Sequence, residues 1–282
     1  MTDGDGEAGS RTARATGAKA GGVRAGRGVN WGAAIAGLFK LAPKALKIGK
    51  LGKLALLGGS VGAYSLLFTW EFALVICGAI LFHELGHVLA MRWYGVPVKG
   101  IYLIPFVGGV AVGDPGRVRL SEWQQFVIAI MGPAIGFVTA AVPLVVFDVT
   151  GYAFAAAAAS WIALVNLFNL LPIYPLDGGR MLRALFASAG ARATRVGMVL
   201  SLGLGAALLW QLRIPLLAFI LVVGAIEFYV EVKRGSAATP MPGSAVLAAL
   251  GLYVMLAAAL MTVMFAVQDS PSAGLALELL KD

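Results

Sequence analysis

The chain has 282 residues, of which 60% are hydrophobic and only 13% are charged. With a mean hydropathy of +0.87, this composition excludes an ordinary soluble domain and predicts an all-α multispan membrane protein. The net charge of +8 is compatible with nucleic-acid binding, but the basic residues follow membrane topology, and we expect no nucleic-acid partner. The single cysteine, Cys77, excludes a disulfide framework and a thiolate metal cluster.

The N-terminal part differs in composition from the rest. Residues 1–30 are rich in Gly, Ala, Arg and Thr and lack the hydrophobic region of a signal peptide, which predicts a disordered tail. Residues 31–54 carry a lysine every three or four positions with apolar residues between, interrupted at Pro43. This pattern predicts a basic amphipathic helix on an anionic membrane surface. We interpret it as a cytoplasmic topology anchor; a sensor or a partner-binding surface is the alternative.

The transmembrane domain is predicted over residues 55–267, followed by a short C-terminal tail at 268–282. Seven apolar segments predict about seven transmembrane helices. Residues 96–113 are β-branched but broken by Gly and Pro, which predicts a short membrane-associated β-hairpin or a re-entrant segment. The predicted helices cover 55–69, 72–91, 121–147, 152–171, 196–212, 214–232 and 244–267.

The basic residues predict the orientation of these spans. If the N-terminus is cytoplasmic, 20 of the 22 Lys and Arg residues fall on the cytoplasmic side. Only Arg213 and Lys281 fall opposite. This asymmetry favours seven spans with a cytoplasmic N-terminus.

The residues that carry chemistry lie in the second apolar segment. His83 and His87 are the only two histidines, and because they are four residues apart they share one helix face, with Glu84 beside it. His-Glu-x-x-His on a helix is typical of a zinc site in which the glutamate is the general base. The alternative is a buried histidine pair bonded to neighbouring helices. Two imidazoles and a carboxylate are costly to bury in lipid without binding partners, so we favour the metal site over the histidine pair.

A catalytic zinc site needs a third protein ligand. Asp177 is the best candidate, because prolines before it end the preceding helix and glycines after it let the backbone turn inward. The alternatives for Asp177 are a helix N-cap or an ion pair with Arg180. Weaker ligand candidates are two glutamates that could instead pair near Lys233, and one aspartate in the opposite loop: Glu227, Glu231 and Asp148.

These motifs resemble the site-2 protease family of intramembrane zinc metalloproteases, in a minimal form without PDZ or CBS domains. The resemblance covers residues 72–185, the three-helix catalytic core. It rests on four stretches: HELGH at 83–87, IPFVGG at 104–109, MGP at 131–133 and NLLPIYPLDGGR at 169–180.

The resemblance implies a role for each matching residue. One Zn²⁺ per chain would be bound by His83, His87 and Asp177, with Glu84 as the catalytic base. Asn169 would hold the scissile carbonyl or its oxyanion. Residues 96–113 would be the membrane-associated strands that pair with an unwound substrate; the alternative is an ordinary hairpin that seals the core.

The chain also departs from the family pattern. Its linkers are too short for a PDZ domain, and where relatives often have an asparagine after the Gly-Pro pair, this chain has Ala134-Ile135-Gly136. We therefore expect substrate recognition to come from the membrane core, from the basic N-terminal segment or from a separate adaptor.

Together these observations predict an intramembrane zinc metalloendopeptidase that cleaves single-span membrane proteins within the lipid bilayer of a bacterial plasma membrane. A noncatalytic scaffold of the same fold, which binds membrane helices, is the first alternative. A transporter that uses the histidines as a metal or proton path is the second. It would need polar residues along several spans, and residues 123–147 and 149–176 carry no charge.

Overall fold

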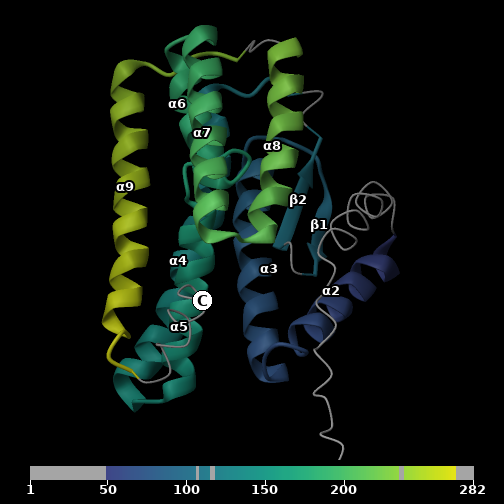
Figure 1. Cartoon of the computed structure of the whole chain (residues 1–282), viewed down its shortest axis with the longest axis vertical. Coiled ribbons are helices and arrows are strands. Elements are labelled where there is room, and N and C mark those ends of the chain that lie inside the picture. Colours follow the sequence, from purple (N-terminus) through teal and green to yellow (C-terminus); the bar gives the residue numbers. More distant parts are fainter. Residues whose placement is uncertain (1–48, 106–107, 115–117, 235–237, 271–282) are drawn as a thin grey trace, which may run out of the picture.

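The protein is a bundle of helices with a two-stranded hairpin against one side (Figure 1). The computed structural model describes residues 49–105, 108–114, 118–234 and 238–270. The predicted N-terminal tail and most of the basic helix and the C-terminal tail lie outside these residues. In chain order the elements are α2 (Lys50–Tyr64), α3 (Trp70–Trp93), β1 (Val98–Ile104), β2 (Gly108–Gly113), α4 (Glu122–Thr150), α5 (Ala153–Asn169), α6 (Asp177–Ser188), α7 (Ala191–Leu212), α8 (Pro215–Arg234) and α9 (Gly243–Ala266).

Four of the described helices, α3, α4, α7 and α9, are long and apolar enough to cross a membrane. The other three predicted spans, at 55–69, 152–171 and 214–232, are not confirmed. The first two correspond to α2 and α5, which have 15 and 17 residues. At 1.5 Å per residue they reach only about 23 and 26 Å, short of the roughly 30 Å of a hydrocarbon core.

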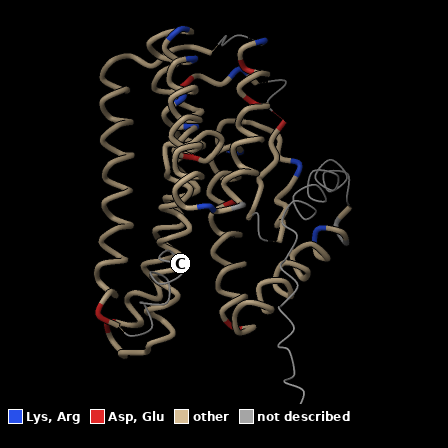
Figure 2. The backbone as a smooth tube through the Cα atoms, viewed as in Figure 1, with Lys and Arg blue, Asp and Glu red and all other residues tan. Residues whose placement is uncertain are grey.

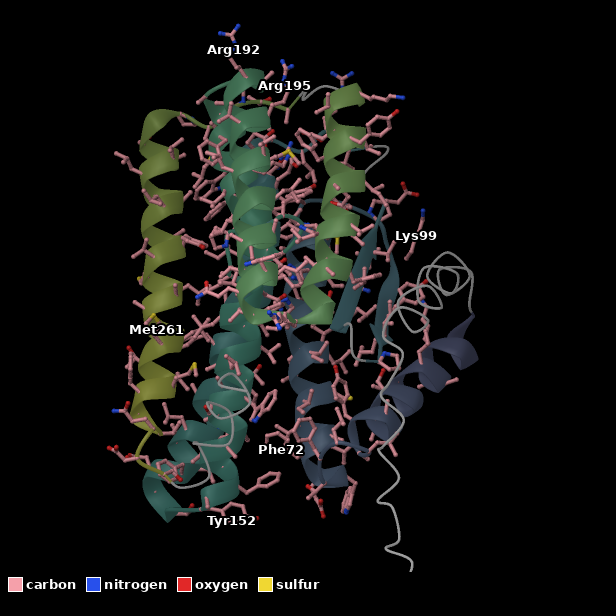
Figure 3. The ribbon with its side chains drawn as sticks, viewed as in Figure 1. Phe72, Lys99, Tyr152, Arg192, Arg195 and Met261 are labelled. Atoms are coloured by element: carbon pink, nitrogen blue, oxygen red, sulfur yellow. The ribbon has the colours of Figure 1, made fainter. Side chains whose placement is uncertain are left out.

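Charge is distributed unevenly along the bundle. Figure 2 shows Lys and Arg gathered mainly toward the end where α7 begins, and Figure 3 places Arg192 and Arg195 there, with Phe72 and Tyr152 toward the opposite end. This arrangement fits the predicted asymmetry, although which end is cytoplasmic stays a prediction. The turn between α7 and α8 lies near the middle of the bundle in Figure 1, not at the end where α3 begins.

Helices α3 and α4 approach closely because small residues face each other. Ser121 caps α4 with a reciprocal capping box in which its hydroxyl accepts from the Gln124 backbone N–H. Further along, a methyl group on Gly86 would overlap the Met131 carbonyl oxygen, so only glycine allows this contact. Buried residues of α4, α5, α6 and α9 form the main apolar core beside it, including Phe126, Ala163, Met181 and Leu260.

The segment at 96–113 forms a β-hairpin, as the sequence predicts. Strands β1 and β2 are antiparallel, with Tyr102 opposite Val110 and Leu103 opposite Gly109. Helix α2 lies along the outer side of β1 (Figure 1). There Lys53 Nζ donates to the Lys99 carbonyl oxygen at 2.9 Å, and Ser60 Oγ donates to the Leu103 carbonyl oxygen at 3.4 Å. The outer edge of β1 is therefore already engaged by side chains of α2.

Candidate metal centre

Helix α3 presents its two histidines to the interior of the bundle. His83 and His87 are one turn apart, and their Nε2 atoms lie 3.1 Å from each other. His83 is only 3% exposed. Both rings are held from behind through Nδ1: His87 by the Ile128 carbonyl oxygen of α4 at 2.7 Å, and His83 by the Asn166 Oδ1 atom of α5 at 2.8 Å. When Nδ1 donates these hydrogen bonds, the Nε2 lone pair of each ring is available to a metal.

Asp177 reaches the same point from the other side. It is the first residue of α6, after the residue 170–176 turn, and its Oδ2 atom lies 3.0 Å from His83 Nε2 and 3.3 Å from His87 Nε2. The turn is so tight that a methyl group on Gly178 would overlap the Leu170 carbonyl oxygen. The glycine after Asp177 therefore lets α6 begin directly against the end of α5.

The three donor atoms have the spacing that a zinc ion requires. Zinc bonds of 2.0–2.1 Å in a tetrahedral arrangement place neighbouring ligand atoms about 3.3 Å apart, and the observed separations are 3.0, 3.1 and 3.3 Å. Among the described residues these three form a group that can hold a metal ion. Space for it depends on Gly132, where a methyl group would overlap His87 Nε2 and come within 2.9 Å of His83 Nε2. Two imidazoles and a carboxylate with an open side fit zinc.

Glu84 lies beside this group, on the side of the hairpin. It is buried, and a methyl group on Gly109 of β2 would come within 2.8 Å of its Oε1 atom. Among the described residues its carboxylate has no hydrogen-bond partner, and none of their buried side-chain polar atoms is left unsatisfied. Glu84 therefore lies next to the metal-binding group without being one of its donors.

The sequence alternatives for Asp177 are not what the structure contains. The N-cap position of α6 belongs to Leu176, and Arg180 pairs with Glu227 of α8 at 3.8 Å. Glu227 and Glu231, for which a pairing near Lys233 was one possibility, contact Arg180 and Arg183 of α6. Asp148, the third weaker candidate, lies in the last turns of α4, far along that helix from Gly132.

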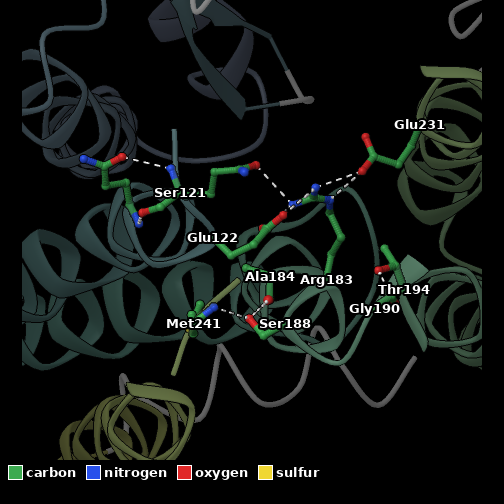
Figure 4. Close-up of polar contacts among 11 residues, drawn as sticks. Ser121, Glu122, Arg183, Ala184, Ser188, Gly190, Thr194, Glu231 and Met241 are labelled. Carbon is green, nitrogen blue, oxygen red and sulfur yellow. Dashed lines mark hydrogen bonds and ion pairs between the residues drawn. The ribbon is translucent and has the colours of Figure 1, made fainter. Parts of the chain in front are cut away.

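A buried ion network fixes α6 beside α4 and α8 (Figure 4). Arg183 donates to Glu122 at 2.9 Å and to Glu231 at 2.8 Å, and also to Gln125 at 3.1 Å. Glu122 is only 1% exposed. Burial lowers the pKa of the Arg183 guanidinium, but the two carboxylates outweigh burial and raise that pKa above its ordinary value. The network begins two turns after Asp177 and so holds the helix that carries it.

Two asparagines of α5 have different surroundings. Asn169, named by the resemblance, is the last residue of the helix, and its side chain has no hydrogen bond to another described residue. Asn166, one turn earlier, is the asparagine that contacts His83. Asn166 is not among the site residues predicted from the sequence. The available signal was its spacing of three from Asn169, which puts both near one face of α5.

Comparison with known proteins agrees with this geometry. The family model of peptidase family M50 matches residues 71–161 and 149–212, together half of the chain. The chain therefore belongs to peptidase family M50, the site-2 protease family.

Individual relatives match over the same core. Zinc metalloprotease MJ0392 of Methanocaldococcus jannaschii is 34% identical over 137 residues, 47% of this chain and 39% of the relative. Rip3 of Mycobacterium tuberculosis is 34% identical over 166 residues, 52% of this chain and 42% of the relative. Stage IV sporulation protein FB of Bacillus subtilis is 34% identical over 110 residues, 38% of each chain. The matches thus span well under half of each relative.

Proposed function

We propose that this protein is an intramembrane zinc metalloendopeptidase that cleaves transmembrane segments of single-span membrane proteins. The observation that carries the proposal is the triangle of His83, His87 and Asp177 donor atoms, 3.0–3.3 Å apart, with its two histidines on a membrane-spanning helix. Membership of peptidase family M50 supports it. One zinc ion per chain would be held by these three residues.

Glu84 is proposed as the general base. Bound zinc supplies, at neutral pH, a water whose pKa is lowered to about 7. Glu84 accepts a proton from the attacking water as the water oxygen bonds to the scissile carbonyl carbon. When the carbon–nitrogen bond breaks, Glu84 returns the proton to the departing amine nitrogen. The position of Glu84 beside the three donor atoms, with no hydrogen bond from a described residue, suits this exchange.

Asn169 is proposed to donate its side-chain amide to the carbonyl oxygen as negative charge develops there. Its freedom from other described hydrogen bonds supports this role. A substrate bound at the end of α5 would give the Asn169 amide a hydrogen-bond partner that none of the described residues provides.

The outer edge of β2 is proposed as the edge that receives the unwound substrate. The Leu103 carbonyl turns outward to Ser60, so Leu103 and Gly109 form a non-hydrogen-bonded pair, and the Gly109 backbone groups turn away from β1. Gly109 is also the residue that lies against Glu84. A peptide added to this edge would pass the proposed base, whereas one added to β1 would first have to displace α2.

Replacement of Glu84 by Gln tests the proposal. The wild-type and Glu84→Gln proteins are each expressed in cells. The small membrane-protein fragments in the cell membranes and the zinc content of the two proteins are then compared. A protease loses its fragments in the variant but keeps zinc. If both proteins yield the same fragments, or if the wild type contains no zinc, the proposal fails. A noncatalytic scaffold of the same fold would instead retain its activity after the replacement.

We also propose that the protein is an integral multi-pass protein of a bacterial plasma membrane with its N-terminus in the cytoplasm. Its proposed partners are the lipid bilayer and a single-span membrane protein as substrate, with a separate adaptor protein as a candidate for substrate recognition.

A further inference from the structure

Asn166 occupies a fully buried position between α5, α3 and α4. Its exposed fraction is 0%. The Oδ1 atom lies 2.8 Å from His83 Nδ1, and the Nδ2 group donates to the Ile162 carbonyl oxygen at 2.7 Å. A methyl group on Gly136 of α4 would overlap the Asn166 amide, so α4 leaves room for this one side chain.

The contact with Ile162 determines how the amide faces. A carbonyl oxygen only accepts hydrogen bonds, so the donating amide nitrogen must face Ile162 and the amide oxygen must face His83. The Nδ1 atom of His83 must then carry the proton. Its Nε2 atom keeps a lone pair, directed toward His87 and Asp177.

We propose that Asn166 is a positioning residue that fixes the tautomer and the ring orientation of His83 for metal binding. The inference rests on the zinc site of the proposed function. It distinguishes the two histidines, because His87 is held by the backbone carbonyl of Ile128, which no substitution removes. His83 depends on a side chain, and its orientation can be lost by mutation. A neutral amide also holds the ring without adding a second negative charge to the site.

Zinc affinity of the purified full-length protein tests the proposal by competition with a chelator. Asn166→Leu keeps the approximate volume but removes the acceptor, and we expect zinc to bind about 10–100-fold more weakly, as is usual when a group that orients a ligand is lost. Asn166→Asp restores an acceptor to Nδ1 but places its second carboxylate oxygen near the Ile162 carbonyl oxygen, where the amide donated at 2.7 Å. We therefore expect it to bind zinc more tightly than Asn166→Leu and less tightly than the wild type.

Two controls separate positioning from packing. Ser160→Ala changes another buried polar residue of α5, and we expect unchanged affinity. Asn169→Leu should keep zinc but lose cleavage. If the wild type binds no zinc, the proposed function itself fails. If the wild type binds zinc and Asn166→Leu binds it equally well, or if the Leu and Asp variants lose affinity equally, only the positioning role of Asn166 is overturned.

Discussion

The two sides of helix α3 are built differently. On the side of α4, α5 and α6, a methyl group on Gly86 of α3, or on Gly132 or Gly136 of α4, would overlap a neighbouring atom. On the side of α2 and the hairpin, Leu57 and Val61 of α2 pack in an apolar cluster with Leu103 of β1, and Lys53 and Ser60 add two hydrogen bonds. The first side holds the three donor atoms 3.0–3.3 Å apart, and the second borders the edge at which we propose that a substrate enters. The close contacts of the first side therefore serve metal binding, whereas α2 covers β1 and leaves the outer edge of β2 for a peptide.

The largest effect is expected from Gly132→Val on the closely packed side. The added side chain would occupy the space between the two histidines, so zinc should bind at least about 100-fold more weakly, the upper range for groups that support metal ligands, and cleavage should be lost. Zinc binding is measured as the zinc content of the purified protein, and cleavage as the formation of membrane-protein fragments. Gly78→Val is the matched control, because no atom lies within 4 Å of its added Cβ. Equal zinc content in the two variants would contradict the assigned role of Gly132.

An intermediate effect is expected where α6 is fastened to α4. Arg183→Met removes the buried positive charge that Glu122 and Glu231 share, and we expect about 3–5 kcal/mol of stability to be lost. Thermal unfolding in detergent, at a pH where both carboxylates are ionised, measures the loss.

Its control is an exposed ion pair of the hairpin. Lys99 and Asp114 lie 3.0 Å apart with side chains 60% and 53% exposed, so Lys99→Met should change stability by about 0–1 kcal/mol. A smaller loss in Arg183→Met than in Lys99→Met would show that the buried network does not fasten α6.

The smallest effect is expected on the side of α2 and the hairpin. Lys53→Met removes the hydrogen bond to the Lys99 carbonyl and should cost about 0.5–1.5 kcal/mol, without lowering zinc affinity. Unfolding and chelator competition check the two parts. A large loss of zinc in this variant would mean that the two sides of α3 are coupled, and that α2 contributes to metal binding.

Much of the site could be predicted because its parts are local. The spacing of His83 and His87 sets a shared helix face by itself, and the prolines and glycines around Asp177 set a turn by themselves. The hairpin at 96–113 was readable for the same reason, since its Gly and Pro interruptions are incompatible with a helix.

The remaining features depend on which helices become neighbours, and this information is not local. Glu227 and Glu231 pair with two arginines of α6 because α8 faces α6. The sequence of α8 alone left open a pairing of these glutamates near Lys233. Asn166 matters only because α5 packs against α3 at that level. The lengths of α2 and α5 also differ from the prediction, because apolar composition continues past Tyr64 and Asn169, where the two helices end.

The engagement of β1 by α2 has a consequence for neighbouring molecules. Exposed strand edges are the places where separate chains join, and two carbonyl groups of the β1 edge, those of Lys99 and Leu103, already accept hydrogen bonds from α2. A chain that joined this edge would have to break both contacts first, which protects the hairpin against edge-to-edge association on that side.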